Sequence, residues 1–295
     1  MTLKATTIDR LMKGAIDCHV HVAPDPFRER RLDALQLAHL AQESMMRALV
    51  LKSHHYCTAP LACIVNQVVP EVLLIGSLVL NEGAGGLNPV VIEVAVQAGA
   101  KLIWMPTYSS VVDTKRRIQP GAYHVPSSLS SNGISIINRN GELVPQMRSI
   151  LEVVKDNNLT LATGHISVPE IYTIATKVKD MGVKLVITHP LTEQFGSPLT
   201  IKQQQELVDM GAFIEHCFDT CMPLHGRLDP MRMAEAINRV GAEHCILSTD
   251  FGQAENPNPV EGMRMMITTM LKCGLSEKEL ELLVKVNPGK LLDLA

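Results

Sequence analysis

The feature that most constrains the fold of this chain is a regular alternation between short apolar runs and longer segments with helical periodicity. The runs of strand-forming residues fall at 15–22, 47–54, 72–80, 101–106, 159–164, 183–188, 212–217 and 244–249. Helical patterns follow at 32–45, 61–69, 89–98, 142–157, 169–181, 200–210 and 230–240, and two more close the chain at 259–272 and 276–285. Strands that alternate with helices in this way form parallel sheets. Eight such units predict an α/β fold of the (β/α)₈ barrel type.

Length and charge are consistent with one barrel domain that spans residues 1–295. The chain has 295 residues, 46% of them apolar, and a formal net charge of −3. A chain of this size buries one large core, and its charge balance gives no indication of nucleic-acid or membrane partners. We expect a small-molecule substrate as the partner, and a homo-oligomer is compatible with the sequence.

The sequence also favours a reducing compartment. The seven cysteines are odd in number and lack paired Cys-x-x-Cys motifs, which argues against a disulfide framework. There is no run of about 18 apolar residues, and Asp9, Arg10 and Lys13 interrupt any apolar stretch at the start of the sequence. We therefore expect a cytoplasmic location.

One region, residues 107–141, breaks the alternation of strands and helices. It shows no helical period and is rich in Ser, Gly, Pro and Arg. Within it, residues 133–143 predict a hairpin that turns at Asn140-Gly141. A connection this long inside a compact domain typically forms a functional lid or a binding loop, so we interpret 107–141 as a lid-like insertion after the fourth strand.

Several of the predicted strands end in residues that bind metals. His19 and His21 close the first strand, where alternation of side chains places them on one face together with Asp17. A lone His-x-His pair would be equally compatible with a hydrogen-bonded core pair. Three later strands, however, end at His165, His189 and Asp250. Asp250 follows Ser248-Thr249 and has a helix N-cap as its alternative role.

These residues and their strand order resemble the amidohydrolase superfamily of metal-dependent hydrolases. The similarity covers the barrel from about Asp17 to the tail at 287–292, without an evident β-sandwich domain. It implies a divalent ion, zinc first and manganese second, present as one or two ions. It also implies that Asp250 takes the proton of the attacking water, and that His189 acts on the substrate where only one ion binds. The implied ligands are His19, His21, His165, His189 and Asp250. Imidazole nitrogen and carboxylate oxygen suit such an ion, which keeps an open position for water in catalytic sites.

The fourth strand departs from the pattern of two-metal members, which place a carboxylated lysine or a glutamate there. It ends in Ile103-Trp104-Met105-Pro106-Thr107 and offers no such ligand. Lys52, at the end of the apolar second strand, is the candidate that fills this role, because a buried ammonium is costly unless it is modified, deprotonated or paired. The alternatives are a site with one metal ion, and an ion pair between Lys52 and either Asp17 or Glu215.

Other polar residues near the strand ends are candidates for contact with the substrate. Residues Arg28–Arg31 and 115–117 place several arginines near this end of the barrel, which favours an anionic small molecule. Glu215 is a candidate either for the substrate or for support of a metal ligand. His124 and His225 lie in loops on the same side. The predicted substrate-binding residues are His54, Glu215, Arg28 and Tyr108.

Three classes of function remain open from the sequence. The first is a metal-dependent hydrolase that cleaves an amide, cyclic amide, lactone or ester. The second is a lyase on the same barrel, either a metal-dependent decarboxylase or an aldolase that forms a Schiff base through Lys52. The third is a barrel without catalysis that binds a metal or ligand. The resemblance favours the hydrolase.

Overall fold

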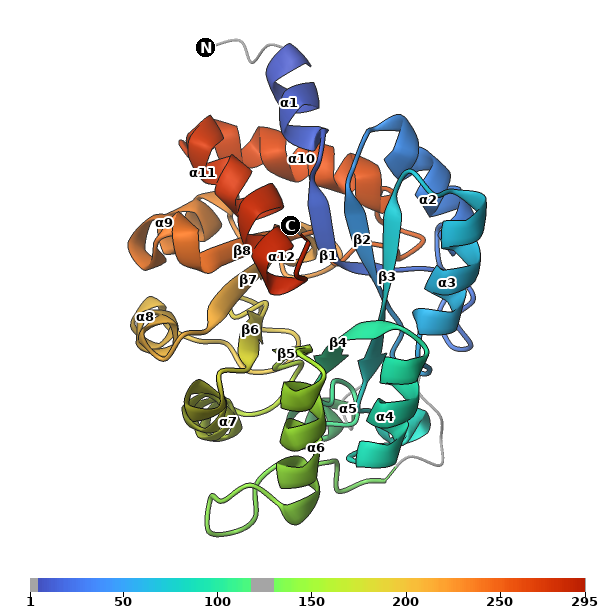
Figure 1. The fold of residues 1–295 in the computed structure, drawn as a ribbon. Helices are drawn as coiled ribbons and strands as arrows, with labels where there is room; N and C mark the ends of the chain where they lie inside the picture. Colours follow the sequence, from blue (N-terminus) through green and yellow to red (C-terminus); the bar gives the residue numbers. More distant parts are fainter. Residues whose placement is uncertain (1–4, 118–129, 295) are drawn as a thin grey trace.

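The protein forms a barrel of eight parallel strands that pair in chain order, with helices on the outside (Figure 1). The structure is a computed structural model that describes residues 5–117 and 130–294. The strands are β1 (Ile16–His21), β2 (Ala48–Lys52), β3 (Leu73–Val79), β4 (Ala100–Trp104), β5 (Thr160–Ala162), β6 (Lys184–Thr188), β7 (Phe213–Cys217) and β8 (Cys245–Ser248). Each pairs in parallel with the next. The predicted (β/α)₈ barrel is therefore confirmed.

The barrel closes where β8 returns to β1. The backbone N–H of Asp250 donates to the carbonyl of His19 at 2.8 Å, and the N–H of His21 donates to the carbonyl of Phe251 at 2.8 Å. The carboxylate of Asp17 supports this closure, since it accepts hydrogen bonds from the backbone N–H and the hydroxyl of Thr249 at 3.0 and 2.6 Å. The two strands that carry the principal metal-ligand candidates are thus joined directly.

The outer helices begin and end close to the predicted positions. Those that follow the strands are α2 (Ala34–Glu43), α3 (Ala59–Val68), α4 (Pro89–Gln97), α6 (Pro145–Asp156), α7 (Val168–Met181), α8 (Ile201–Asp209), α9 (Pro230–Val240) and α10 (Pro259–Lys272). Local sequence explains several starts, because capping boxes at Asp33, Ser167 and Thr200 satisfy N–H groups of the first turn. An N-terminal helix, α1 (Ala5–Met12), was not predicted and packs beside α10 (Figure 1).

The core has an inner and an outer layer. The inner layer fills the barrel with side chains such as Ile16, Val50, Trp104 and Val186, and the outer layer lies between the strands and the helices. Alternate residues of a strand supply the two layers. Side chains at the carboxyl ends of the strands that point inward therefore face the interior of the barrel or its mouth.

The C-terminal segment closes the end of the barrel opposite the carboxyl ends of the strands. After α11 (Glu277–Glu281) and the π-helical turn η4 (Leu282–Val286), α12 (Asn287–Leu291) lies over the barrel axis (Figure 1). Leu291 and Leu292 pack in the inner core layer. The carbonyl of Leu291 accepts hydrogen bonds from Thr160 and Lys184, the first residues of β5 and β6. Access to the barrel interior is therefore from the carboxyl ends of the strands.

The region predicted as a lid-like insertion without a helical period contains a helix, α5 (Val111–Arg117). The prediction of no helix was wrong there, because α5 is short and Asp113, Thr114, Lys115 and the arginines hide any apolar period. The predicted hairpin is present, with Ile137 and Leu143 bridged in antiparallel fashion. Residues 118–129, which include His124, lie outside the described residues. Among the helices that the structure describes, none is long and apolar enough to cross a membrane.

Candidate metal centre

The side chains at the end of β1 owe their direction to an irregularity in the strand. The register between β1 and β2 shifts between Asp17 and Val20. Cys18 packs inside the barrel, Val20 packs against the helices, and the ring of His19 lies 4.5 Å from that of Trp104 in the interior. Strict alternation, which predicted Asp17 on the same face as the two histidines, does not hold here. Asp17 instead hydrogen-bonds Thr249.

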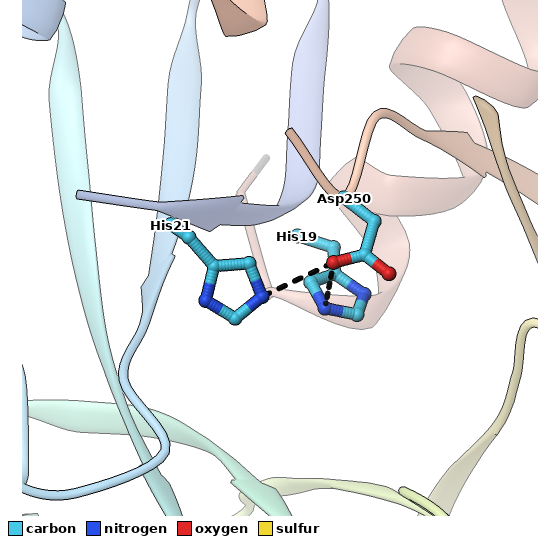
Figure 2. A group of neighbouring side chains, drawn as sticks. All are labelled: His19, His21 and Asp250. Carbon is cyan, nitrogen blue, oxygen red and sulfur yellow. Dashed lines mark hydrogen bonds and ion pairs between the residues drawn. The ribbon is translucent and has the colours of Figure 1, made fainter. Parts of the chain in front are cut away.

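His19, His21 and Asp250 converge on one point at the carboxyl end of the barrel (Figure 2). One carboxylate oxygen, Oδ1 of Asp250, lies 3.0 Å from Nε2 of His19 and 3.1 Å from Nε2 of His21. The three potential ligand atoms lie within 4.8 Å of one another, and the two histidines are buried. Asp250 has a positive φ of 55°, which turns the chain out of β8. These three residues could hold a metal ion together.

His165 and His189 form the opposite wall of the same pocket. Their Nε2 atoms face each other at 3.1 Å, and the ring of His189 lies 6.3 Å from that of His19. Gly164 allows this placement, because a Cβ there would lie 2.3 Å from the carbonyl oxygen of Met105 and its φ is +54°. Four of the five predicted ligands, His21, His165, His189 and Asp250, therefore line one pocket, and His19 adjoins it through its contact with Asp250.

Electrostatics at the centre favour neutral imidazoles at His21 and His189 and an ionised carboxylate at Asp250. Burial lowers the pKa of His21 and of His189 well below the usual histidine value. Burial alone would raise the pKa of Asp250, but His19 and His21 outweigh it and hold this pKa well below the usual range. Neutral imidazole and carboxylate are the forms that bind metals. This donor set fits a zinc-like or manganese-like divalent ion.

His19 is held from behind by two groups on β7. Its Nδ1 lies 3.3 Å from Oε2 of Glu215 and 3.6 Å from Sγ of Cys217. Burial lowers the pKa of His19, but the carboxylates of Asp250 and Glu215 more than compensate, so that this pKa is raised. Glu215 is fully buried and does not line the pocket. Of its two predicted roles, this position favours support of a metal ligand over contact with the substrate.

Lys52 points from the end of β2 to the same centre. Its Nζ lies 2.9 Å from Nε2 of His19 and 4.3 Å from the centroid of the Trp104 ring. Burial lowers the pKa of Lys52. Within residues 5–117 and 130–294, Lys52 forms no ion pair with Asp17 or Glu215. Trp104 thus fills the end of β4, where the sequence offered no metal ligand.

The remaining predicted substrate contacts are divided between the pocket and its surroundings. His54 lines the pocket, with its ring 4.9 Å from that of His21 and Nδ1 2.9 Å from Oγ1 of Thr107. Arg28 also lines it and pairs with Glu255. Tyr108 does not line the pocket, and its hydroxyl lies 3.3 Å from Nδ1 of His55.

Arg30, which was not among the predicted substrate-binding residues, is a buried arginine of the pocket. It lines the pocket, its side chain is 4% exposed, and it forms two hydrogen bonds to Asp25 at 2.9 and 2.7 Å. Its positive charge lowers the pKa values of His21 and His54 in addition to the effect of burial. Arg30 therefore brings a buried cation to the pocket beside the two histidines.

Two carboxylates of the site were not predicted. Asp219 lies two residues beyond β7, and its Oδ2 is 3.1 Å from Nδ1 of His225. Both residues line the pocket. Its place just after a strand was a usable signal. Asp113 on α5 lies with Oδ2 2.5 Å from Nδ1 of His165. Nothing in the sequence pattern pointed to Asp113, because its helix lies in the region of irregular composition.

One family model matches a large part of the chain. Residues 14–215 match the model of a family of unknown function, DUF6282. No curated protein matches the sequence.

Solved structures that share the fold include several of amidohydrolase type. An amidohydrolase from Pseudomonas aeruginosa has a TM-score of 0.61 at 14% identity, with 98% of each chain covered. A structure described as a probable dipeptidase from the same organism has a TM-score of 0.60 at 11% identity, also with 98% of each chain covered. A dihydroxybenzoic acid decarboxylase from a Polaromonas species, with bound manganese and the inhibitor 2-nitroresorcinol, has a TM-score of 0.58 at 12% identity and covers 96% of this chain and 97% of its own. The amidohydrolase-type barrel predicted from the motifs is therefore confirmed as the fold.

Proposed function

The chain belongs to the DUF6282 family, and we propose that it is a metal-dependent hydrolase that cleaves an amide, cyclic amide, lactone or ester of a small anionic molecule. The observation that carries the proposal is the convergence of His19 and His21 on a single carboxylate oxygen of Asp250. Two imidazoles and a carboxylate around one point, with His165 and His189 opposite, form a donor set for a catalytic metal site.

A divalent ion held by these residues would acidify a water molecule and polarise the bond to be cleaved. The neighbouring histidines keep Asp250 ionised, and this carboxylate would accept the proton of that water. Glu215 and Cys217 hold His19 from behind and orient its Nε2 toward Asp250.

The leaving group also needs a proton, and His225 is placed to supply it. Burial lowers the pKa of His225, but the hydrogen bond and charge of Asp219 outweigh burial and raise it. With Nδ1 facing Asp219, the other nitrogen, Nε2, lacks a hydrogen-bond partner among the described residues, although the carboxylate of Glu255 lies 3.5 Å away. An imidazolium that persists to higher pH and borders the pocket suits a general acid.

The preference for an anionic substrate rests on Arg28 and Arg30. Both line the pocket, and guanidinium groups bind carboxylates and phosphates through paired hydrogen bonds. Each already has a carboxylate partner, Glu255 and Asp25 respectively. A substrate anion would therefore share or displace these partners, more readily at the partly exposed Arg28 than at the buried Arg30.

Metal analysis followed by a substrate screen tests the proposal. Elemental analysis of the purified protein should give about one to two equivalents of a divalent ion per chain. The metal-replete protein should then hydrolyse a member of a panel of lactones, amides, cyclic amides and esters that carry a carboxylate. Full activity after exhaustive chelation, in protein verified to be metal-free, would refute the hydrolase.

A metal-dependent decarboxylase is the second candidate, because one structure of the same fold is a decarboxylase with bound manganese. The same metal ligands and the proton donor His225 would serve that reaction. Release of carbon dioxide from hydroxybenzoates, without hydrolysis in the panel, would favour the decarboxylase. A Schiff-base aldolase would instead be trapped at Lys52 by borohydride in the presence of a carbonyl substrate and would not need metal.

A further inference from the structure

Asp113 of α5 is a buried carboxylate that lies directly behind His165. Its side chain is fully buried, and its Oδ2 lies 2.5 Å from Nδ1 of His165. On the other side of the imidazole ring, Nε2 of His165 faces Nε2 of His189 at 3.1 Å. The ring of His165 thus joins a carboxylate on one side to the cavity of the candidate metal centre on the other.

The second carboxylate oxygen of Asp113, Oδ1, contacts two neighbouring residues. Oδ1 accepts a hydrogen bond from the backbone N–H of Gly196, in the loop after β6, at 3.0 Å. It also lies 3.3 Å from Nη1 of Arg116, one turn further along α5. The backbone N–H of Asp113 itself donates to Oγ of Ser110 at 3.1 Å. Both carboxylate oxygens are therefore engaged, which fixes the orientation of the group.

The ring of His165 is also confined sterically. Gly196 packs so closely that a Cβ there would lie 3.1 Å from Cα of His165, and its φ of +57° suits glycine. The ring of Phe195 stacks on that of His165, with centroids 6.0 Å apart and planes 14° apart. The loop after β6 and helix α5 therefore hold the imidazole ring in one place between them.

The chemistry of the pair selects one form of His165. An ionised carboxylate only accepts hydrogen bonds, so the proton of a neutral imidazole beside Asp113 resides on Nδ1. Nε2 then carries a lone pair directed into the cavity, which is the form that binds a metal ion. We infer that Asp113 is a positioning residue that holds His165 in this metal-binding tautomer and orientation. The inference rests on the proposed function for the role of His165, and the tautomer itself is independent of it.

Replacement of Asp113 by asparagine tests this role. In the Asp113→Asn variant the amide oxygen can keep the hydrogen bond from Gly196, while the amide nitrogen facing Nδ1 is a donor. His165 should then shift its proton to Nε2, away from the metal-binding form. The Arg116→Gln variant is the matched control, because it removes a contact of Asp113 without altering the pair with His165.

Two measurements report on this change. Long-range proton–nitrogen NMR spectra of metal-free protein distinguish the two tautomers, and the signals of His165 are assigned by their loss in a His165→Gln variant. We expect the Nδ1–H form in the wild type and in Arg116→Gln, and the Nε2–H form in Asp113→Asn. Competition with a chromophoric chelator for Zn²⁺ should show an affinity about 10–100-fold weaker in Asp113→Asn, with no change in Arg116→Gln.

Distinct results would overturn the inference. An Nε2–H tautomer in the wild-type protein would do so even if Asp113→Asn fails to fold. Unchanged Zn²⁺ affinity and tautomer in a folded Asp113→Asn variant, with only a lower melting temperature, would mean that Asp113 merely anchors α5. If the wild type binds no divalent ion, the proposed function fails, and the tautomer of His165 alone decides whether Asp113 positions the ring.

Discussion

Replacement of Lys52 by methionine separates two roles that predict opposite changes in metal binding. Methionine fills a similar volume without charge, so the buried position should stay packed. If Lys52 is an ammonium, its removal should strengthen metal binding, because a neighbouring positive charge is lost. If Lys52 carries a carboxyl group that binds the metal, its removal should weaken binding.

The structure sets the size of the first effect. Nζ of Lys52 lies 2.9 Å from Nε2 of His19, and an ion bound to that nitrogen at about 2.1 Å would lie within about 5 Å of Nζ. At an effective dielectric constant of about 20, a divalent ion and an ammonium about 5 Å apart repel each other by about 7 kcal/mol. An ammonium and the ion would therefore largely exclude each other. A lysine carbamate removes the repulsion and supplies the anionic bridge that two metal ions need.

We therefore expect the Lys52→Met variant to lose about one equivalent of metal. Elemental analysis of wild type and variant, purified in parallel, measures this loss. Carbon NMR after exchange with labelled bicarbonate should show a carbamate signal in the wild type only. Lys184→Met is the control, because Lys184 lies at the opposite end of the barrel and hydrogen-bonds Leu291. Full metal stoichiometry or tighter binding in Lys52→Met would refute the bridging role and favour a single metal ion.

His19→Ala should lose metal and activity together, whereas Asp250→Asn should keep part of the metal and lose most turnover, since it keeps an oxygen but removes the base. Normal hydrolysis by Asp250→Asn would exclude Asp250 as the base; its alternative role as a helix N-cap does not hold, because the cap of the following helix, α10, is Asn258. Burial lowers the pKa of His216 from 6.5 to about 4, so the unfolded state binds more protons at this residue between these values, and His216 should contribute a rise of about 3 kcal/mol to the free energy of unfolding from pH 4 to pH 6.5. The other buried histidines with lowered pKa values, such as His21 and His189, add to the rise, so urea unfolding should show a rise in His216→Leu that is smaller by this amount, and an equal rise in the two proteins would exclude His216 as a source. Gly252→Ala should lower the melting temperature and the metal content, because the new Cβ would lie 1.9 Å from the carbonyl oxygen of His21 at a φ of +141°. Gly274→Ala is the control: Gly274 has a φ of +99° and open space around it, so this change should lower only the stability. Equal metal content in the two variants would contradict the steric argument.

The sequence by itself predicted the barrel and the positions where its strands end. The apolar runs carry a local signal, because a strand buried in a parallel sheet needs a near-continuous run of apolar residues whatever its partners are. The carboxyl ends of parallel strands meet at one end of a barrel. His19, His21, His165, His189 and Asp250 could therefore be expected around one cavity without knowledge of any contact.

Other features were decided by tertiary contacts. The bend of β1 that turns Asp17 toward Thr249 arises from its pairing with β2 and β8. Trp104 occupies the end of β4 against His19 and Lys52, a packing that no strand pattern encodes.

Asp113 shows most clearly why part of the site could not be predicted from the sequence. It meets His165 across 52 positions of sequence, through a short helix without an apolar period. Local propensity and periodicity describe how a segment buries its own apolar face. A hydrogen bond such as that between Asp113 and the metal-ligand candidate His165 depends instead on which distant segments the closed barrel brings together. Only the tertiary structure determines those contacts.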